Sequence, residues 1–362
     1  MGLARWLRRG HSSRRDPLAG ARHVVVLGGG TGMSTALRGL KGRGVRITAI
    51  VSMADDGGSS GVLRERLGIP PVGDLRNCLI ALADAEPTAG ALLQHRIPTE
   101  PGSTRGHPVG NLLLAAAIAE EGGDLERGVE RVHRILQVRG RVVPATSGAT
   151  RLRGRTRSGV IIHGQAALAR TRGIAGVELE PAEAAAAASA IEAIRTADLL
   201  VLGPGSLYTS VIPHLLVPGI RAALSRRRAP LVWVANVDEQ EGETEGLDLE
   251  AHVAALYAHG GEGIIDAVLA AAPLRGRRRE QIGTPLHPAY RDDQRLARAR
   301  GLPPLIVRDI TSRLRPHLHD AARLGAAIDG LRVVAAHTVR SEEHTSELQS
   351  LAYLVCRLLL EK

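Results

Sequence analysis

Phenylalanine is absent from this chain of 362 residues, and aromatic side chains as a whole make up only 2% of it. Proteins that read single-stranded RNA stack its bases on aromatic rings, so this scarcity disfavours that class of function. The hydrophobic content is nevertheless 44%, which is enough for one large or two medium domains. The core must then be built from Leu, Val, Ile and Ala, as is typical of the buried strands of a parallel sheet.

Cysteine and lysine are also scarce. Two cysteines, Cys78 and Cys356, make no disulfide framework, and no metal-ligand cluster is recognisable, so we expect no metal centre and a reducing, cytoplasmic location. Lysine occurs only at positions 41 and 362, and the net charge of +10 comes from arginine clusters that lie far apart. Such scattered charge is typical of a solvated surface, so nucleic acid is not the expected partner.

Long apolar runs are missing as well. No segment is long enough to span a membrane, and residues 1–22 carry arginines without the apolar stretch of a signal peptide. We therefore expect a disordered basic leader over 1–22 and no membrane partner. Residues 341–362 lose the Arg-, Ala- and Gly-rich composition and resemble a translated sequencing adapter. Our interpretation is a non-native appended tail.

A strand, a glycine-rich turn, a helix and a second strand are predicted within about thirty residues, over 23–51. Apolar runs at 197–202 and 231–235 extend the same sheet, and helices are expected over 111–121 and 183–195. The pattern predicts an α/β fold over 23–330: a doubly wound, mostly parallel Rossmann-like sheet with helices on both faces. Short segments at 142–144, 152 and 160–163 indicate a small antiparallel, β-rich insert at about 140–175.

The turn after the first strand is the strongest candidate site. It consists of Gly28, Gly29, Gly30, Thr31 and Gly32. Glycines let the backbone approach an anion closely, and the following helix directs free N–H groups and its positive dipole end toward that anion. The turn therefore predicts a phosphate cradle for a nucleotide-type ligand. Met33 occupies the third glycine position of the dinucleotide fingerprint, which weakens a dehydrogenase interpretation.

A second turn of the same kind follows the strand at 197–202. Its residues Gly203, Gly205 and Ser206 predict another anion cradle at the carboxyl edge of the sheet, where open α/β sheets bind ligands. Asn236 follows the strand at 231–235 and would project at the same edge. It could hydrogen-bond a base or a sugar there, or simply cap its strand.

Two carboxylates, Asp55 and Asp56, follow the second strand. An acid at this position commonly accepts ribose hydroxyls, and Asp55 stands where that geometry requires it. The pair could instead hold Mg²⁺, or be solvated loop acids.

Two further blocks lead into apolar helices. Arg76 could clamp a phosphate, and His107 could transfer protons near neutral pH. Asp74 and Asn111 are equally compatible with helix capping and with ligand contact. No nucleophilic triad can be assembled, since Ser206 has no assignable base, so the sequence does not indicate catalysis.

Five blocks together carry a family resemblance: Gly-Gly-Gly-Thr-Gly at 28–32, Ala-Asp-Asp-Gly-Gly-Ser-Ser-Gly at 54–61, Gly-Asp-Leu-Arg-Asn-Cys-Leu at 73–79, Gly-His-Pro-Val-Gly-Asn-Leu-Leu-Leu-Ala at 106–115 and Gly-Pro-Gly-Ser-Leu-Tyr-Thr-Ser at 203–210. From about 23 to 325 the chain resembles the YvcK-like family of gluconeogenesis factors, which shares a superfamily with CofD, the 2-phospho-L-lactate transferase. The run at 237–244 departs from the usual family pattern by adding acidic residues.

The resemblance implies a cytoplasmic, UDP-sugar-binding regulatory protein needed for cell shape and wall synthesis during gluconeogenic growth, with no established reaction. Partners would be the nucleotide-type ligand and wall regulatory proteins, and homo-oligomers are left open. Carried onto this chain, the ligand site would comprise Gly29, Gly30, Thr31, Asp55, Asn111, Gly205, Ser206 and Asn236. The alternative is a CofD-like, Mg²⁺-dependent transferase of a phosphorylated small acid from a nucleotide-activated donor.

Overall fold

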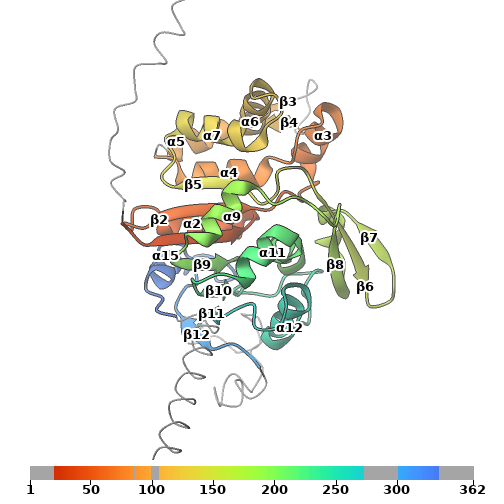
Figure 1. Ribbon diagram of the computed structural model, residues 1–362, viewed down its shortest axis with the longest axis vertical. Helices are drawn as coiled ribbons and strands as arrows, with labels where there is room; N and C mark the ends of the chain where they lie inside the picture. Colours follow the sequence, from red (N-terminus) through yellow and green to blue (C-terminus); the bar gives the residue numbers. More distant parts are fainter. Residues whose placement is uncertain (1–19, 85, 99–105, 273–300, 334–362) are drawn as a thin grey trace, which may run out of the picture.

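The computed structural model describes residues 20–84, 86–98, 106–272 and 301–333 (Figure 1). Residues 1–19 of the expected leader and the whole expected tail lie outside them. Seven parallel strands form one sheet in the order β12-β11-β10-β9-β1-β2-β5. In chain order they are β1 (His23–Gly28), β2 (Arg46–Val51), β5 (Arg141–Pro144), β9 (Leu199–Leu202), β10 (Leu231–Val234), β11 (Ala267–Ala271) and β12 (Leu305–Arg308).

The strand order is that of a dinucleotide-binding fold. Counted along the chain, the first six strands follow the order 3-2-1-4-5-6, and β12 adds a seventh at one edge. Figure 1 shows this succession from β5 at the top of the sheet to β12 at the bottom. The predicted doubly wound parallel sheet is therefore confirmed.

Helices cover both faces of the sheet. The layer on one face contains α2 (Gly30–Leu40), α4 (Gly73–Leu82), α6 (Val109–Glu120), α7 (Leu125–Leu136) and α15 (Ala321–Asp329). The layer on the other face contains α9 (Ala188–Arg195), η1 (Leu207–Val211), α10 (Ile212–Leu216), α11 (Pro218–Ser225) and α12 (Leu249–Gly260). The other elements between β2 and α6 are α3 (Gly58–Leu67), α5 (Glu86–Gln94), β3 (Arg96–Pro98) and β4 (Gly106–Pro108).

Strand β1 shows why this sequence becomes a central strand. All six of its residues are buried. Val24 and Val26 pack into the α2 layer, whereas Val25 and Leu27 pack into the α10 layer. Each such side chain stabilises the fold by about 1.5–3 kcal/mol on burial. A strand that is apolar at every position is therefore stable only between two helical layers.

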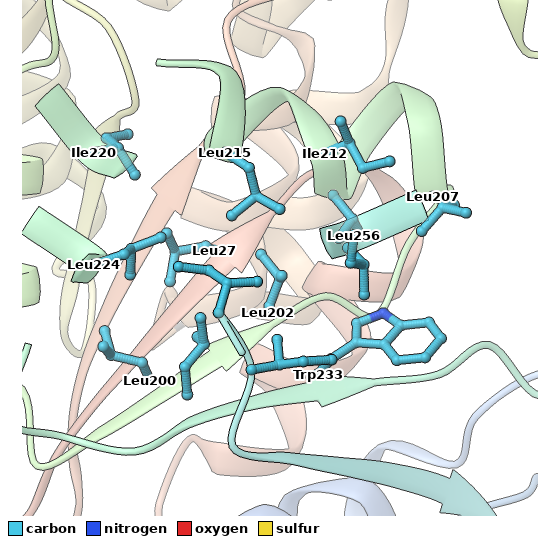
Figure 2. Close-up of a cluster of buried hydrophobic side chains, with 14 of the residues drawn as sticks. Leu27, Leu200, Leu202, Leu207, Ile212, Leu215, Ile220, Leu224, Trp233 and Leu256 are labelled. Carbon is cyan, nitrogen blue, oxygen red and sulfur yellow. The ribbon is translucent and has the colours of Figure 1, made fainter. Parts of the chain in front are cut away.

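The core on the α10 side is aliphatic, as the composition predicts. Figure 2 shows leucines and isoleucines from β1, β9 and the α10–α11 segment meeting around Trp233. The indole is one of few large rings available, and it stacks on His252 with ring centroids 5.8 Å apart. Aliphatic side chains thus fill the core volume that phenylalanine rings partly fill in other proteins.

A small antiparallel sheet is inserted after β5. It consists of β6 (Arg151–Thr156) between β7 (Ile161–His163) and β8 (Ile174–Glu180), with α8 (Gln165–Leu168) between β7 and β8. Figure 1 shows it beside the main sheet. The predicted β-rich insert exists, but residues 142–144 do not belong to it. They form β5, which pairs in parallel with β2, because Val142 and Val143 are buried in the main sheet.

The helix expected over 183–195 is shorter than predicted. It begins only at Ala188, because Ala186 instead makes a β-bridge with Thr146 and Ala187 N donates to Ala145 O at 3.1 Å. Tertiary pairing here overrides the high helix propensity of alanine.

No single helix among the described residues is long and apolar enough to cross a membrane. The consecutive segments Leu207–Leu216 and Pro218–Ser225 pass that test only when taken together, and they are bent by 77°. Their apolar residues Ile212, Leu215 and Ile220 are fully buried in the core.

Helices α2 and α15 touch through glycine. A Cβ on Gly39 would overlap Ala321 O, and one on Gly325 would overlap Gly39 O. We expect Gly39→Ala to separate the two helices and to lower the free energy of unfolding by at least about 2 kcal/mol, since the obstruction is backbone that cannot rotate away. Denaturant titration measures this. Gly148→Ala is the control, because no atom lies within 4 Å of its Cβ position; equal stability of the two variants would contradict the close packing.

Candidate functional site

The carboxyl ends of β1 and β9 lie side by side in the middle of the sheet. Leu27 pairs with Leu202, and Gly203 N donates to Leu27 O at 2.8 Å. From β1 the chain adds strands first on the β2 side and then on the β9 side, so the direction of winding reverses between β1 and β9. Open α/β sheets bind ligands in the crevice outside such a switch point.

The two glycine-rich turns meet at this switch point. A Cβ on Gly32 would lie 2.7 Å from Pro204 O, and one on Gly205 would lie 3.5 Å from Gly29 O. Gly30 and Gly203 also have positive φ angles of 65° and 79°, a conformation that side chains disfavour. Glycine is therefore required both by the contact between the turns and by their backbone conformation. The structure brings the residues of 28–32 together with Gly203, Gly205 and Ser206, as the sequence predicts.

The first turn of α2 faces a carboxyl group of the protein itself. Asp74, at the start of α4, accepts a hydrogen bond from the Gly30 backbone, and its Oδ2 would lie 2.6 Å from a Cβ on Gly29. Burial, and secondly the charge of Asp55, raise the pKa of Asp74 to about 6. A phosphate bound at this turn would share the helix terminus with Asp74, and would be favoured when Asp74 carries a proton.

The helix that follows Ser206 also begins at an internal carboxylate. Glu243 accepts hydrogen bonds from the backbone N–H groups of Tyr208 and Thr209, the latter at 3.0 Å, and from Thr209 Oγ1 at 2.9 Å. Its side chain is only 2% exposed, and burial raises its pKa. Element η1 is a π-helical turn, an uncommon form that is frequent at functional sites. The hydrogen bonds to Glu243 stabilise the start of this turn.

These two carboxylates correct the expectation that both helix termini are open to a ligand. The N–H groups of Gly30, Tyr208 and Thr209 are engaged by Asp74 and Glu243. The dipole of each helix favours a nearby anion, and the protein supplies one at each. What remains for a ligand is the backbone of the two turns themselves.

The adjacent acids Asp55 and Asp56 do not act as a pair. Asp55 Oδ1 accepts from Gly57 N at 2.9 Å, and burial is the main cause that raises its pKa. Asp56 Oδ1 accepts from Ala166 N at 2.9 Å, at the start of α8 in the insert. Their carboxylates thus bind different elements. Among the described residues, no group of three or more His, Cys, Asp or Glu could hold a metal ion. Each of the two carboxylates has its own backbone partner, and Asp56 attaches the insert to the edge of the main sheet.

Arg76 and Asn111 come together although they lie on different helices. Arg76 Nη1 donates to Asn111 Oδ1 at 2.8 Å, and Asn111 Nδ2 donates to Ser59 Oγ at 3.1 Å. The Arg76 stem packs against Gly110, where a Cβ would lie 2.8 Å from it. Arg76 Nε is buried and has no hydrogen-bond partner among the described residues. This N–H is a donor that a bound anion could satisfy.

The other two predicted contacts lie at the same edge. Ser206 precedes η1, and its carbonyl accepts from Ser210 N at 2.9 Å, while its side chain is half-buried. Asn236 follows β10, the strand next to β9, and is half-buried. Every site residue predicted from the sequence therefore lies at or next to the carboxyl edge of the sheet.

Sequence reasoning missed two residues. Glu243 was noted only as part of an unusual acidic run, and Ser59 was not singled out. Nothing in the local sequence shows that Glu243 reaches η1, 34 positions earlier, because that contact depends on how the loop after β10 folds back. The helix-cap interpretation of Asp74 points to the start of its own helix, α4, whereas its carboxyl group faces the start of α2.

Fold and geometry together define a doubly wound, Rossmann-like α/β protein whose two glycine-rich turns meet at the switch point of the sheet. Residues 24–305 match the family model of 2-phospho-L-lactate transferase CofD. The chain belongs to this CofD family, on its YvcK-like, gluconeogenesis factor side.

Named relatives support this assignment. The gluconeogenesis factor of Halalkalibacterium halodurans is 47% identical over 249 residues, which span 68% of this chain and 77% of that protein. The gluconeogenesis factor of Bacillus subtilis is 44% identical over 247 residues, with the same coverage of 68% and 77%. A crystal structure of a UPF0052 family member from Bacillus halodurans has a TM-score of 0.76 at 40% identity, covering 85% of this chain and 98% of that one.

The raised pKa of Asp74 predicts a pH dependence of stability. The folded state keeps the proton up to about pH 6, whereas the unfolded chain loses it near 3.8. Stability contributed by this group is thus fully present below pH 3.8 and is lost as pH rises through 6, by about 3 kcal/mol. We expect Asp74→Asn, which cannot ionise, to gain stability relative to wild type between pH 4 and pH 7 by about that amount.

Urea titrations of both proteins at pH 4 and pH 7 measure this difference. Asp84→Asn serves as the control for the substitution itself, because the Asp84 side chain is 42% exposed and pairs with Arg139 at the surface. A difference between Asp74→Asn and wild type that is the same at both pH values would show that Asp74 ionises as an ordinary surface acid.

Proposed function

We propose that this protein binds a nucleotide sugar of the UDP-sugar class at the switch point and acts as a regulatory protein during gluconeogenic growth, in support of cell shape and wall synthesis. The observation that carries the proposal is the contact between two glycine-rich turns, which converge at the carboxyl ends of β1 and β9. Backbone that can approach this closely suits a diphosphate, whose charge needs donors at short range.

The charges around the turns favour an elongated ligand over a bare phosphate. Asp74 and Asp55 make the α2 side partly acidic, which favours hydroxyl groups that donate hydrogen bonds. Arg76, with its buried and unpartnered Nε, offers a cation nearby for an anionic group. A nucleotide sugar presents both kinds of group, with hydroxyls on its ribose and sugar and anionic oxygens on its diphosphate.

A regulatory role, rather than turnover, fits what is known of the relatives by name. The relatives from Halalkalibacterium halodurans and Bacillus subtilis are called gluconeogenesis factors. Binding of a sugar nucleotide would report the supply of wall precursors to partner proteins in the cytoplasm. The β6–β8 insert could take part, since Ala166 N of α8 donates to Asp56 in the loop after β2, and Gln165 Nε2 of α8 donates to Thr209 O in η1.

Calorimetry tests the binding proposal. We expect wild-type protein to bind UDP-N-acetylglucosamine, and Gly32→Ala to lose at least tenfold in affinity because the added Cβ would push against Pro204 O. The control is Gly148→Ala, whose Cβ enters open space and should leave affinity unchanged. Circular dichroism confirms that each variant is folded. Failure of the folded wild-type protein to bind any UDP-sugar at millimolar concentration would overturn the proposal.

A second candidate function is suggested by the family model, which is named for 2-phospho-L-lactate transferase. In that case a phosphorylated small acid would move from a nucleotide-activated donor to an acceptor. Asp55 and Asp56 would then be the candidate Mg²⁺ ligands, each with one oxygen that already accepts a backbone hydrogen bond, from Gly57 N and from Ala166 N respectively. Incubation with Mg²⁺, an alcohol acceptor and guanylylated or uridylylated phospholactate, followed by mass spectrometry, discriminates the two. Product formation would replace the binding proposal with the transferase.

A further inference from the structure

A serine and a histidine form a close pair at the rim of the site. Ser59 lies in the first turn of α3 and His107 in the middle of β4, and Ser59 Oγ is 2.8 Å from His107 Nδ1. This separation is within the reach required of a nucleophile and its general base. Both side chains are half-buried. The two residues are 48 positions apart in the chain, so the pair is a product of the fold.

The hydrogen-bond network orients the Asn111 amide and leaves the Ser59 hydroxyl able to donate to His107. Arg76 can only donate, so the oxygen of the Asn111 amide must face Arg76 and its NH₂ group must face Ser59. Ser59 Oγ therefore accepts from Asn111, which leaves its own hydrogen available for donation to His107 Nδ1. When neutral His107 carries its proton on Nε2, it presents the Nδ1 lone pair to the serine. This is the protonation state in which a histidine can act as a base toward Ser59.

The backbone on both sides of the pair is held in place. His107 pairs with Ile97 in the β3–β4 ladder, Arg96 Nη1 donates to Gly106 O at 2.7 Å, and Val109 N donates to His95 O at 2.9 Å. On the other side, Asn111 is only 1% exposed, so its amide cannot turn freely. Such fixed orientation is what distinguishes a prepared nucleophile from a surface hydroxyl.

Charge developing on Ser59 would be stabilised where it arises. The Asn111 NH₂ group already donates to Oγ at 3.1 Å, and Arg76 polarises that amide from its far end at 2.8 Å. Ser59 also stands at the N-terminus of α3, whose dipole favours negative charge. The following residue, Ser60, hydrogen-bonds Asp55 and lies against Gly73, which connects the pair to the candidate ligand site.

We propose that Ser59 and His107 are a nucleophile–base pair that can accept a phosphorus-linked group from a nucleotide phosphoanhydride. Ser59 Oγ attacks phosphorus and forms a new O–P bond, while its proton passes to His107 Nδ1. The P–O bond of the anhydride breaks, and the leaving phosphate takes the electron pair. The class of substrate rests on the proposed function, whereas the reactivity of Ser59 does not.

An organic fluorophosphonate tests the reactivity of Ser59 without requiring any nucleotide to bind. Ser59 Oγ forms the O–P bond, the P–F bond breaks, fluoride leaves with the electron pair, and His107 takes the proton. We expect the folded full-length chain to be labelled at Ser59, as located by peptide mass spectrometry.

Two variants and one control make the result decisive. Ser59→Ala should lose the label, and His107→Gln, which keeps a hydrogen-bonding side chain but no base, should slow labelling by about 100-fold or more. Ser225→Ala is the control, since Ser225 is an exposed serine that bonds only the Arg221 carbonyl of its own helix, and it should label like wild type. No label on Ser59, or equal labelling rates in His107→Gln and wild type, would show that the pair is only a tie between α3 and β4.

The natural reaction is tested with UDP-N-acetylglucosamine carrying ³²P in both phosphates. Label that stays on Ser59 after denaturation supports the proposed transfer, and the added mass identifies which side of the anhydride was kept. Calorimetry on the same preparation separates the two proposals. If the UDP-sugar binds but Ser59 is unreactive, the proposal that Ser59 is a nucleophile is overturned and the proposed function stands. A reactive Ser59 without UDP-sugar binding supports the nucleophile and overturns the proposed function.

Discussion

The contact between the turn after β1 and the turn after β9 is the constraint on which the rest of the site depends. Gly32 meets Pro204 O where the winding of the sheet reverses, at a distance that leaves no room for a side chain. Helix α15 presses on α2 from one side, and Glu243 holds the start of η1 on the other. The helices that follow the two turns are therefore each held by a contact from another part of the chain.

Electrostatically, the site is balanced rather than simply positive. A helix terminus attracts anions, yet Asp74 stands at the start of α2 and Glu243 at the start of η1. Both carboxyl groups have raised pKa values because burial disfavours their charged forms. A purely anionic guest at this site would meet like charge from these two carboxyl groups whenever they are ionised.

The fold could be predicted largely from the sequence, because apolar runs ending in glycine have one stable environment, the interior of a parallel sheet. The positions of the two turns followed from the same pattern, since carboxyl ends of parallel strands share an edge. The partners of those turns could not be predicted. Asp74 contacts Gly30 and Glu243 contacts Thr209, in each case across many positions of the chain. No periodic pattern in the sequence predicts either contact. The misplacement of residues 142–144 has a related cause: a short strand among arginines looks the same whether it lies in a small sheet or at the edge of a large one.

The glycine contact between α2 and α15 has a consequence for how the molecule is made. Helix α2 is the first helix after β1, and Gly325 on α15 is almost three hundred residues further along the chain. Arg22 adds a second tie between these distant regions, through the carbonyls of Asp329 and Leu331. A ribosome synthesises the chain from its N-terminus. Helix α2 therefore cannot pack against α15 until nearly all of the described residues have been synthesised. A nascent or truncated copy of this protein would therefore hold the motif without holding the site.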